Sequence, residues 1–235
     1  MKLRELCEKI EYTCLQGSMD VEIADIIYDS RKLEQGTAFV CMIGAKTDGH
    51  KYIPDAVAKK ASAIVVEKEV DLAEIPAEIT VISVASARKA LACMSAAYFG
   101  YPARELTTIG LTGTKGKTTT SYYIKAILDV WEKKQQGKET GILSSVDIYD
   151  GKELVPAKMT TPEAMEIHRH IRNCADESIR YLTMEVSSQA LKYKRVRGLK
   201  FDVGIFLNIS EDHISPCEHE NFEDYFTSKL SLFKQ

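Results

Sequence analysis

The sequence predicts an α/β protein with two domains, each built around a mostly parallel sheet that helices cover. Short apolar runs rich in β-branched residues alternate with runs of helical spacing, which is the pattern of strands separated by helices. A stretch rich in Gly and Pro at residues 99–105 divides this alternation into two series. The chain has 235 residues, more than one typical domain needs. We therefore expect a first domain over residues 1–102 and a second over residues 103–235.

The first series predicts three strands and two helices. The runs at residues 37–44, 62–67 and 79–86 are short and apolar, which favours strands. The segments at residues 51–61 and 87–100 are rich in Ala, Leu and Lys at a spacing that suits amphipathic helices. This order is typical of a parallel sheet covered by helices.

The second series is longer and ends in a helix. Four segments are expected to form strands, the last two of them buried: residues 106–113, 140–151 (with a turn), 179–188 and 201–210. Three helices are expected, from about Lys117 to near Gly137, over residues 161–177, and over residues 221–235. Pro162 stands at the expected first position of the second helix, where its fixed φ and missing N–H are tolerated. A doubly wound sheet of this kind usually continues, so we expect the second domain to be truncated.

Charge and cysteine usage exclude several classes of protein. The 31 basic and 34 acidic residues give a net charge of -3, which argues against a nucleic-acid binder. The six cysteines form no C-x-x-C pair and no short Cys/His ladder, so we expect free thiols in a reducing compartment. The N-terminus lacks the apolar core of a signal peptide, and no apolar run is long enough to span a membrane. We expect a cytoplasmic monomer.

The segment GLTGTKGKTTT at residues 110–120 joins a predicted strand to a predicted helix and resembles a phosphate-binding P-loop. The strict pattern G-x-x-x-x-G-K-[ST] fails, because Gly110 lies one residue too early. The mechanical requirements remain: Gly113 and Gly116 permit close backbone approach, and the helix N-terminus attracts anions. Lys117 would then reach the β- and γ-phosphates, and the Thr118 hydroxyl would bind Mg²⁺. The alternative is a glycine-rich turn before an ordinary helix.

Three further polar residues stand where apolar strands or helices meet loops. Glu185 closes an apolar strand, where a carboxylate is costly unless it is paired or binds a metal; a capping or salt-bridged Glu is the alternative. His213 follows a strand end, where open α/β sheets bind ligands, although a lone histidine is more often structural. From the pattern alone, Lys229 is a solvated helix lysine.

Several motifs together resemble the Mur ligase family, whose loop has the form T-G-T-x-G-K-[ST]. The resemblance is closest to the MurE type and is carried, in family order, by residues 28–53, the loop at 110–120, TTPEAM at 160–165, MEVSSQAL at 184–191, LNISEDH at 207–213 and FEDYFTSK at 222–229. It implies a Rossmann-like N-terminal domain that binds a UDP-linked substrate. It also implies an incomplete P-loop central domain with a mostly parallel sheet, with the amino-acid-binding C-terminal domain absent from this sequence.

The resemblance also implies ATP and Mg²⁺ as cofactors. The ATP-binding residues would be Thr112, Gly113, Thr114, Lys115, Gly116, Lys117 and Thr118. Glu185 and His213 match Mg²⁺ ligands of the family, alongside Thr118. Lys229 matches a lysine that is carbamylated, which would turn an ammonium into an anion beside the metal. Lys117, Glu185, His213 and Lys229 would thus form the catalytic group.

The substrate site follows from the same resemblance. Thr160, Thr161, Ser187 and Arg195 are expected to meet the acceptor, with the planar fork of Arg195 suited to a carboxylate. Thr161 could instead cap the helix after Pro162. Residues 29–31 and 44–50 would form the uridine-diphosphate pocket, with Ser30 its strongest candidate; both segments also suit plain turns.

The implied reaction is the ATP-dependent ligation of a third amino acid, L-lysine or meso-diaminopimelate, to UDP-N-acetylmuramoyl-L-Ala-D-Glu in peptidoglycan synthesis. ATP would phosphorylate the D-Glu side carboxylate, and the amine of the amino acid would attack the acyl phosphate. The protein would contribute positioning and charge neutralisation.

Some positions depart from the common family pattern. Lys115 stands where Asn is frequent, Gln189 where His is frequent and Tyr193 where Gln is frequent. The segment between His213 and Lys229 is about two residues longer than usual, as in some lysine-adding ligases of Gram-positive bacteria. We expect that this chain does not complete the reaction alone. The alternatives are a non-catalytic binder of nucleotide and UDP-muramoyl-peptide, and a relative of folylpolyglutamate synthase, against which residues 29–50 argue.

Overall fold

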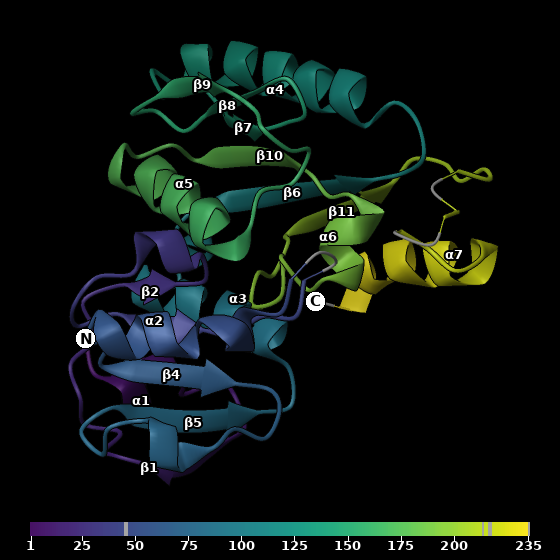
Figure 1. Ribbon diagram of the computed structural model, residues 1–235. Coiled ribbons are helices and arrows are strands. Elements are labelled where there is room, and N and C mark those ends of the chain that lie inside the picture. The colour runs from purple at the N-terminus through teal and green to yellow at the C-terminus, as the bar shows by residue number, and fades with distance from the viewer. Residues whose placement is uncertain (45–46, 213, 216–217, 235) are drawn as a thin grey trace. The chain divides into compact units, whose positions relative to one another are not determined.

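The computed structural model describes residues 1–44, 47–212, 214–215 and 218–234. The chain forms two compact units, Met1–Tyr98 and Phe99–Gln235 (Figure 1). Each has its own sheet. The five cysteines within the described residues, at positions 7, 14, 41, 93 and 174, are free thiols, as expected. No described helix combines the length and the apolar character needed to cross a membrane.

The first unit contains a five-stranded sheet in the order β1-β5-β4-β3-β2. The strands are β1 (Tyr12–Gln16), β2 (Ile26–Ile27), β3 (Ala38–Val40), β4 (Ala63–Val66) and β5 (Thr80–Val84). All pairs are parallel except β1 with β5. The helices are α1 (Leu3–Leu6), α2 (Ile53–Ala58) and α3 (Ala87–Tyr98), with short 3-10 helices at Ser30–Lys32, Gly49–Tyr52 and Leu72–Glu74.

The three strands and two helices expected here are confirmed, and β1, β2 and α1 are additional. The sequence of β1 hides it, because four of its five residues are exposed and show no apolar alternation. The central strand β4 is fully buried on both faces, which explains its continuous apolar sequence. Its side chains pack with Phe39, Val81 and Ala56 in the core of this unit.

The second unit contains a six-stranded sheet in the order β11-β6-β10-β7-β8-β9. Four parallel strands are β6 (Thr107–Thr112), β7 (Gly141–Leu143), β10 (Tyr181–Glu185) and β11 (Val203–Phe206); β8 (Asp147–Tyr149) and β9 (Leu154–Pro156) add antiparallel pairs. The helices are α4 (Lys117–Lys134), α5 (Ala164–Asp176), α6 (Ser188–Lys192) and α7 (Phe222–Leu230), with 3-10 helices at Pro102–Arg104 and Ser231–Lys234. The long helix α4 covers one face of the sheet, and α5 and α6 lie on the other (Figure 1).

Three details of the second unit correct the sequence-based expectations. Pro162 does not lie in the first turn of α5, because the helix begins at Ala164 with Glu163 at the N-cap. Residues 140–151 form two strands that pair as a hairpin, rather than one strand and a turn. Finally, β11 is not buried: Val203 is 43% exposed, since the strand lies at the edge of the sheet and pairs only with β6 among the described strands.

Candidate nucleotide and metal site

The loop at residues 113–116 connects the carboxyl end of β6 to the N-terminus of α4. Both of its glycines have positive φ angles, +156° at Gly113 and +83° at Gly116, which a residue with a side chain rarely adopts. A Cβ atom at Gly113 would also lie 3.1 Å from the Cβ of Leu207. Gly116 has a left-handed conformation at the N-cap of α4, so no side chain covers the first N–H groups of the helix there. The turn therefore keeps backbone donors available to an anion.

The segment that follows β11 holds the loop in place. The Thr114 N–H donates to the Asn208 carbonyl at 3.1 Å. The Asn208 side chain brackets the next residue, because its Oδ1 accepts from Lys115 N at 3.0 Å and its Nδ2 donates to Lys115 O at 3.0 Å. The role of Asn208 was not predicted, although its place after an apolar strand at the ligand-binding edge of a parallel sheet is a signal for it.

Two lysines converge on the Gly113 carbonyl. Nζ of Lys117 and Nζ of Lys229 each donate to Gly113 O at 2.9 Å, and Lys229 reaches it from α7. Burial lowers the pKa of Lys117 below its ordinary value. Burial and the neighbouring Lys117 charge lower the pKa of Lys229 to about 7. Lys229 is 1% exposed, so the interpretation from its local pattern, a solvated helix lysine, is wrong. The amphipathic pattern of α7 does not reveal this contact, which joins residues 116 positions apart.

Glu185 lies next to the start of α4. One carboxylate oxygen accepts from the Thr118 hydroxyl at 3.1 Å, and the other accepts from the Ser145 N–H at 2.8 Å. Glu185 is 1% exposed and has no salt bridge, so neither a capping Glu nor an ion-paired Glu describes it within the described residues. The hydroxyls of Thr118 and Ser145 lie 2.8 Å apart. Ser145 is a further member of this group that sequence reasoning missed, since it stands in a loop without a recognisable motif.

These oxygen atoms fit a hard divalent cation. A buried carboxylate and two hydroxyls are the ligand types that Mg²⁺ prefers, and they adjoin the loop where phosphates would bind. His213, the other expected ligand, lies outside the described residues. The charges of the site also suit a phosphate with a bound cation. Two lysines stand beside the loop, where an anion would lie, and the Glu185 carboxylate stands where a cation would lie.

A cavity of about 270 Å³ opens beside the two lysines. Its lining contains all four acceptor-binding residues expected from the sequence, together with Lys117, Lys229, Gln189 and Glu218. Thr161 does not cap α5. Its hydroxyl donates to Glu185 O at 2.9 Å and accepts from Ser187 N at 3.0 Å, so it joins the loop before α5 to the end of β10. Thr160 takes no part in these two hydrogen bonds and is partly exposed, so its hydroxyl is better placed than that of Thr161 to meet a ligand.

Arg195 already has partners inside the protein. Its Nε lies 2.8 Å from Glu163 Oε1, and its guanidinium donates to Thr161 O at 3.2 Å. The side chain is 13% exposed. A substrate carboxylate would therefore meet an arginine whose fork is held in place by Glu163, and it would compete with that carboxylate for the guanidinium.

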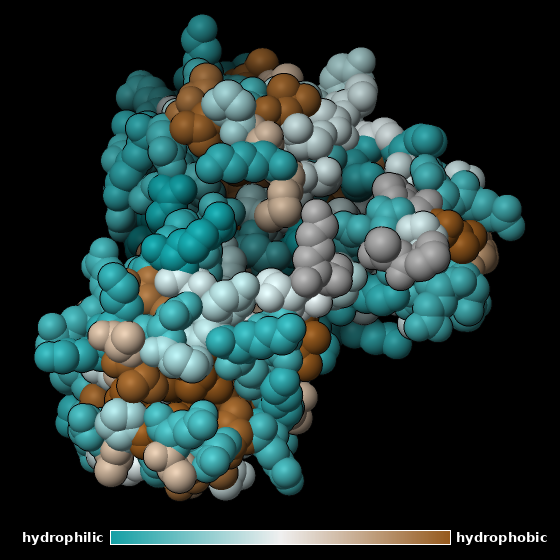
Figure 2. Space-filling view, in the orientation of Figure 1, coloured by the Kyte–Doolittle hydropathy of each residue, from teal (hydrophilic) through white to brown (hydrophobic). Residues whose placement is uncertain are grey.

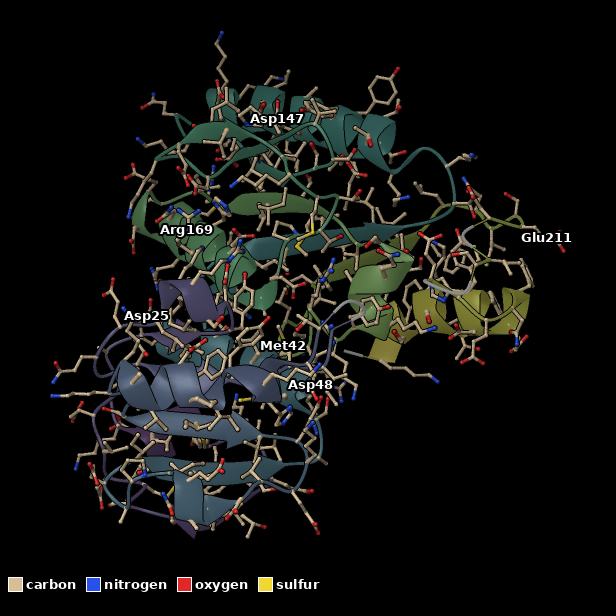
Figure 3. The ribbon with its side chains drawn as sticks, viewed as in Figure 1. Asp25, Met42, Asp48, Asp147, Arg169 and Glu211 are labelled. Carbon is tan, nitrogen blue, oxygen red and sulfur yellow. The ribbon has the colours of Figure 1, made fainter. Side chains whose placement is uncertain are left out.

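The first unit carries the expected uridine-diphosphate residues. Ser30 begins a 3-10 helix whose N-cap is Asp29, which also forms a salt bridge with Arg31. Asp48 (labelled in Figure 3) accepts from the His50 ring at 2.6 Å and pairs with Lys68. The pKa of Asp48 lies below its ordinary value, chiefly because Lys68 donates to it.

A second cavity, of about 350 Å³, lies in the first unit and is lined by residues of the 50–54 and 68–75 segments. Figure 2 shows that apolar residues also reach the surface of this unit among polar ones. Among the described residues of the predicted uridine-diphosphate segments, only His50 lines this cavity, and Ser30 does not. Residues 45–46 of the predicted segment lie outside the described residues. The structure thus brings part of the 44–50 segment to a cavity without joining it to Ser30.

Another group of possible metal ligands was not predicted. Asp150, Glu153 and His170 lie close together beside Arg169 (labelled in Figure 3). The Asp150 oxygens already accept from the His170 ring at 2.6 Å, from Asn173 at 2.8 Å and from two backbone N–H groups. These bonds satisfy the buried carboxylate without an ion, so the group is a structural link between the β8–β9 hairpin and α5.

The fold and the loop define the class of the protein first: an α/β protein with a glycine turn of the P-loop type between a parallel strand and a long helix. Comparison with known families gives the particular family. Residues 111–235 match the Mur ligase middle domain, and residues 22–99 match the Mur ligase family, catalytic domain. The first match alone covers more than half of the chain, which belongs to the Mur ligase family, as its motifs predicted.

Similar curated proteins are of the MurE type. UDP-N-acetylmuramoyl-L-alanyl-D-glutamate--2,6-diaminopimelate ligase of Clostridium perfringens is 42% identical over 235 residues, covering 100% of this chain and 46% of that protein. UDP-N-acetylmuramyl-tripeptide synthetase of Bifidobacterium longum is 46% identical over 217 residues, covering 92% of this chain and 40% of that protein. The chain thus spans less than half the length of these two relatives.

Solved structures show the same fold at low sequence identity. A UDP-N-acetylmuramoyl-L-alanyl-D-glutamate--2,6-diaminopimelate ligase superimposes with a TM-score of 0.74 at 22% identity, covering 99% of this chain and 45% of that one. The MurF ligase from Thermotoga maritima in complex with ADP gives a TM-score of 0.55 at 21% identity, covering 91% of this chain and 43% of that one. The expected α/β architecture with mostly parallel sheets is confirmed.

Proposed function

We propose that the chain provides the UDP-substrate and ATP sites of a ligase that adds the third amino acid to UDP-N-acetylmuramoyl-L-Ala-D-Glu. The observation that carries the proposal is the convergence of Lys117 and Lys229 on one loop carbonyl, beside a carboxylate that Thr118 and Ser145 hold. The names of the similar proteins support the substrate, and diaminopimelate in the Clostridium name supports that amino acid over L-lysine.

The loop residues Thr112 to Thr118 would bind the phosphates of ATP. In the free protein the Lys117 ammonium donates a hydrogen bond to Gly113 O, and it would turn from this carbonyl to the phosphate oxygens. Burial lowers the pKa of Lys117 in the free protein, and a bound anion would stabilise its ammonium form. Bound Mg²⁺, held by Thr118, Glu185 and His213, would supply charge neutralisation at the transferring phosphoryl group.

Lys229 would act as a carbamate rather than as an ammonium. Its neutral amine attacks CO₂ and forms an N–C bond, and the product loses one proton to give an anionic carbamate. A pKa of about 7 keeps a large share of this amine neutral near pH 7, which an ordinary lysine does not do. The carbamate would add an anionic group to the cavity that Lys117 and Lys229 line.

The acceptor would bind in the cavity next to these groups. Thr160 and Arg195 would meet the D-Glu carboxylate, while Thr161 and Ser187 would position the cavity wall through their mutual hydrogen bond. Ser30 would contact the uridine-diphosphate part. The D-Glu side carboxylate would attack the terminal phosphorus of ATP, which releases ADP and gives an acyl phosphate. The amine of the amino acid would then attack the acyl carbon, releasing phosphate and a proton to form the amide. The chain would act in the cytoplasm as a monomer.

Binding without turnover is the second candidate function, since the cavity beside Lys117 and Lys229 offers polar groups that can hold a ligand without any reaction. One experiment separates the two. Pure chain is titrated with UDP-N-acetylmuramoyl-L-Ala-D-Glu by calorimetry, and phosphate release is then measured with ATP, Mg²⁺ and either meso-diaminopimelate or L-lysine. We expect binding of the UDP substrate without turnover. Amino-acid-dependent phosphate release would establish the full ligase reaction, and a folded chain that binds no UDP substrate would refute both candidates.

A further inference from the structure

Tyr225 on α7 contacts both the loop of the candidate nucleotide site and the Lys229 side chain. It is fully buried and is the largest of the completely buried side chains. Its hydroxyl lies 3.0 Å from Thr114 Oγ1 in the loop, and Nζ of Lys229 lies 4.6 Å from the centre of its ring. No residue role given above includes Tyr225, although it lies within the FEDYFTSK motif at residues 222–229.

The Thr114 hydroxyl joins Tyr225 to the segment after β11. It lies 3.3 Å from Ser210 O, accepts from Ser210 N at 3.1 Å, and shares a hydrogen bond of 3.0 Å with the Tyr225 hydroxyl, in which either oxygen can be the donor. These contacts satisfy the hydroxyl of a side chain that is 6% exposed.

Several contacts fix the Tyr225 ring. The His219 ring packs edge-on against it at a centroid distance of 5.2 Å. His219 in turn lies 3.0 Å from Asp224 Oδ2, which also accepts from Lys192 of α6 at 2.7 Å. Because α6 follows β10, these contacts tie the start of α7 to the central strand that carries Glu185. The tyrosine hydroxyl thus reaches the loop from a rigid support.

We propose that Tyr225 is a positioning residue for nucleotide binding: its hydroxyl fixes Thr114 and thereby the phosphate-binding turn, and its ring supports the Lys229 side chain. The inference rests on the proposed ATP site. Tyr225 touches no phosphate itself; it acts through Thr114, whose N–H and hydroxyl are both bonded to the 208–210 segment. Loss of the Tyr225 hydroxyl would remove one hydrogen-bond partner of Thr114 and allow the turn to move.

The test compares Tyr225→Phe, Thr114→Val and the double variant, with Tyr123→Phe as the control, since Tyr123 is 67% exposed on α4. Amide hydrogen exchange of residues 112–118 is measured in the nucleotide-free chain, and ATP affinity is measured by calorimetry with Mg²⁺. We expect faster exchange in the loop and an affinity about three- to tenfold lower in Tyr225→Phe, which corresponds to one neutral hydrogen bond. The double variant should lose no more than Thr114→Val alone, because both changes remove one contact.

Each outcome decides the proposal. Unchanged loop exchange in Tyr225→Phe, unchanged ATP affinity, or additive losses in the double variant would overturn it. If the wild-type chain binds no ATP, the proposed ATP site fails and the positioning role fails with it. If the wild type binds and only the Tyr225→Phe affinity is unaltered, the positioning role alone fails. Circular dichroism of each variant shows whether a loss comes from unfolding, and Tyr123→Phe must match the wild type.

Discussion

The fold changes the acid–base chemistry of Lys229. Burial and Lys117 lower its pKa to about 7, so the neutral amine predominates above that pH and is lost below it. Because only the neutral amine reacts with CO₂, we expect the ¹³C carbamate signal of the chain in ¹³CO₂ to rise from pH 6 to pH 8 at fixed dissolved CO₂. NMR measures this signal, and Lys229→Gln should abolish it. A chain without a carbamate signal at pH 8 would contradict the assignment.

The two loop lysines differ in environment. The Lys115 side chain is 79% exposed and lies 3.4 Å from Asp212, whereas Lys117 is directed at the loop carbonyls. We expect Lys117→Ala to weaken binding of ATP with Mg²⁺ by about 10- to 100-fold, the range for lost charge-assisted hydrogen bonds. Lys115→Asn should leave the affinity nearly intact, because Asn208 binds its backbone rather than its side chain. Calorimetry measures both, and equal losses would refute the distinction.

The burial of His168 on α5 should make the stability of the fold sensitive to acid. His168 is 1% exposed, neither ring nitrogen has a hydrogen-bond partner among the residues that the structure describes, and burial lowers its pKa from 6.5 to about 3. Between these values the unfolded chain binds a proton that the folded chain does not. The free energy of unfolding should therefore fall with pH below 6.5, by about 1.4 kcal/mol per pH unit from this group.

The matched variant for this prediction is His168→Leu. Since the histidine has no partner to lose, an apolar side chain should fold equally well at pH 7 and show a flatter decline between pH 6.5 and pH 4. Urea unfolding at several pH values measures both slopes. Parallel slopes for the wild type and the variant would rule out His168 as the source.

At the residue scale, the sequence predicted chemistry best where one local motif contains it. Gly113, Gly116, Lys117 and Thr118 follow from the glycine positions and the GKT run, and the family resemblance adds Thr112, Thr114 and Lys115. The contacts of Lys229 and Tyr225 do not follow from a local pattern, because they arise when α7 packs against a loop more than a hundred residues away. Ser145 was missed because its loop contains no motif, and Asn208 was matched only as part of LNISEDH, without a role of its own.

At the scale of the element, the turn between β6 and α4 depends on its two glycines unequally. At Gly113 a side chain would meet both a φ of +156° and the Leu207 Cβ at 3.1 Å, whereas at Gly116 it would meet a φ of +83° and open space. We expect Gly113→Ala to lower the melting temperature and ATP affinity more than Gly116→Ala, whose cost is about 1 kcal/mol of backbone strain. Thermal unfolding and calorimetry test this order, and a larger effect at Gly116 would contradict it.

Helix and strand positions were predictable wherever apolar periodicity is strong. The long helix α4 and the buried strands β4 and β10 are such cases. The start of α5 was not predictable. Thr161 before Pro162 has the sequence of a helix N-cap, but the Thr161 hydroxyl donates to Glu185 O of β10 instead, and α5 begins at Ala164. The short strand β2 and the exposed strand β1 carry too little pattern to be seen.

At the scale of the whole molecule, each of the two units carries residues proposed for a different part of the substrates: the first for the uridine diphosphate, the second for ATP and the acceptor carboxylate. The first carries Ser30 and the Asp48–His50 group, and the second carries the loop, the Glu185 group and the acceptor cavity. The order of the motifs along the chain and the family resemblance predicted this division. Its functional meaning stays a prediction. The amino acid that is added has no such signal in the sequence, and it rests on the relatives' names.

The central claim is that the second unit binds ATP with Mg²⁺ through the loop and Glu185. Its most direct test is a calorimetric titration of the chain with ATP, with and without Mg²⁺, for the wild type and Glu185→Gln. We expect one site per chain, tighter binding with Mg²⁺, and a loss of the Mg²⁺ effect in Glu185→Gln, because the variant lacks the buried charge beside Thr118. Absence of ATP binding, or the same Mg²⁺ effect in both proteins, would contradict the claim.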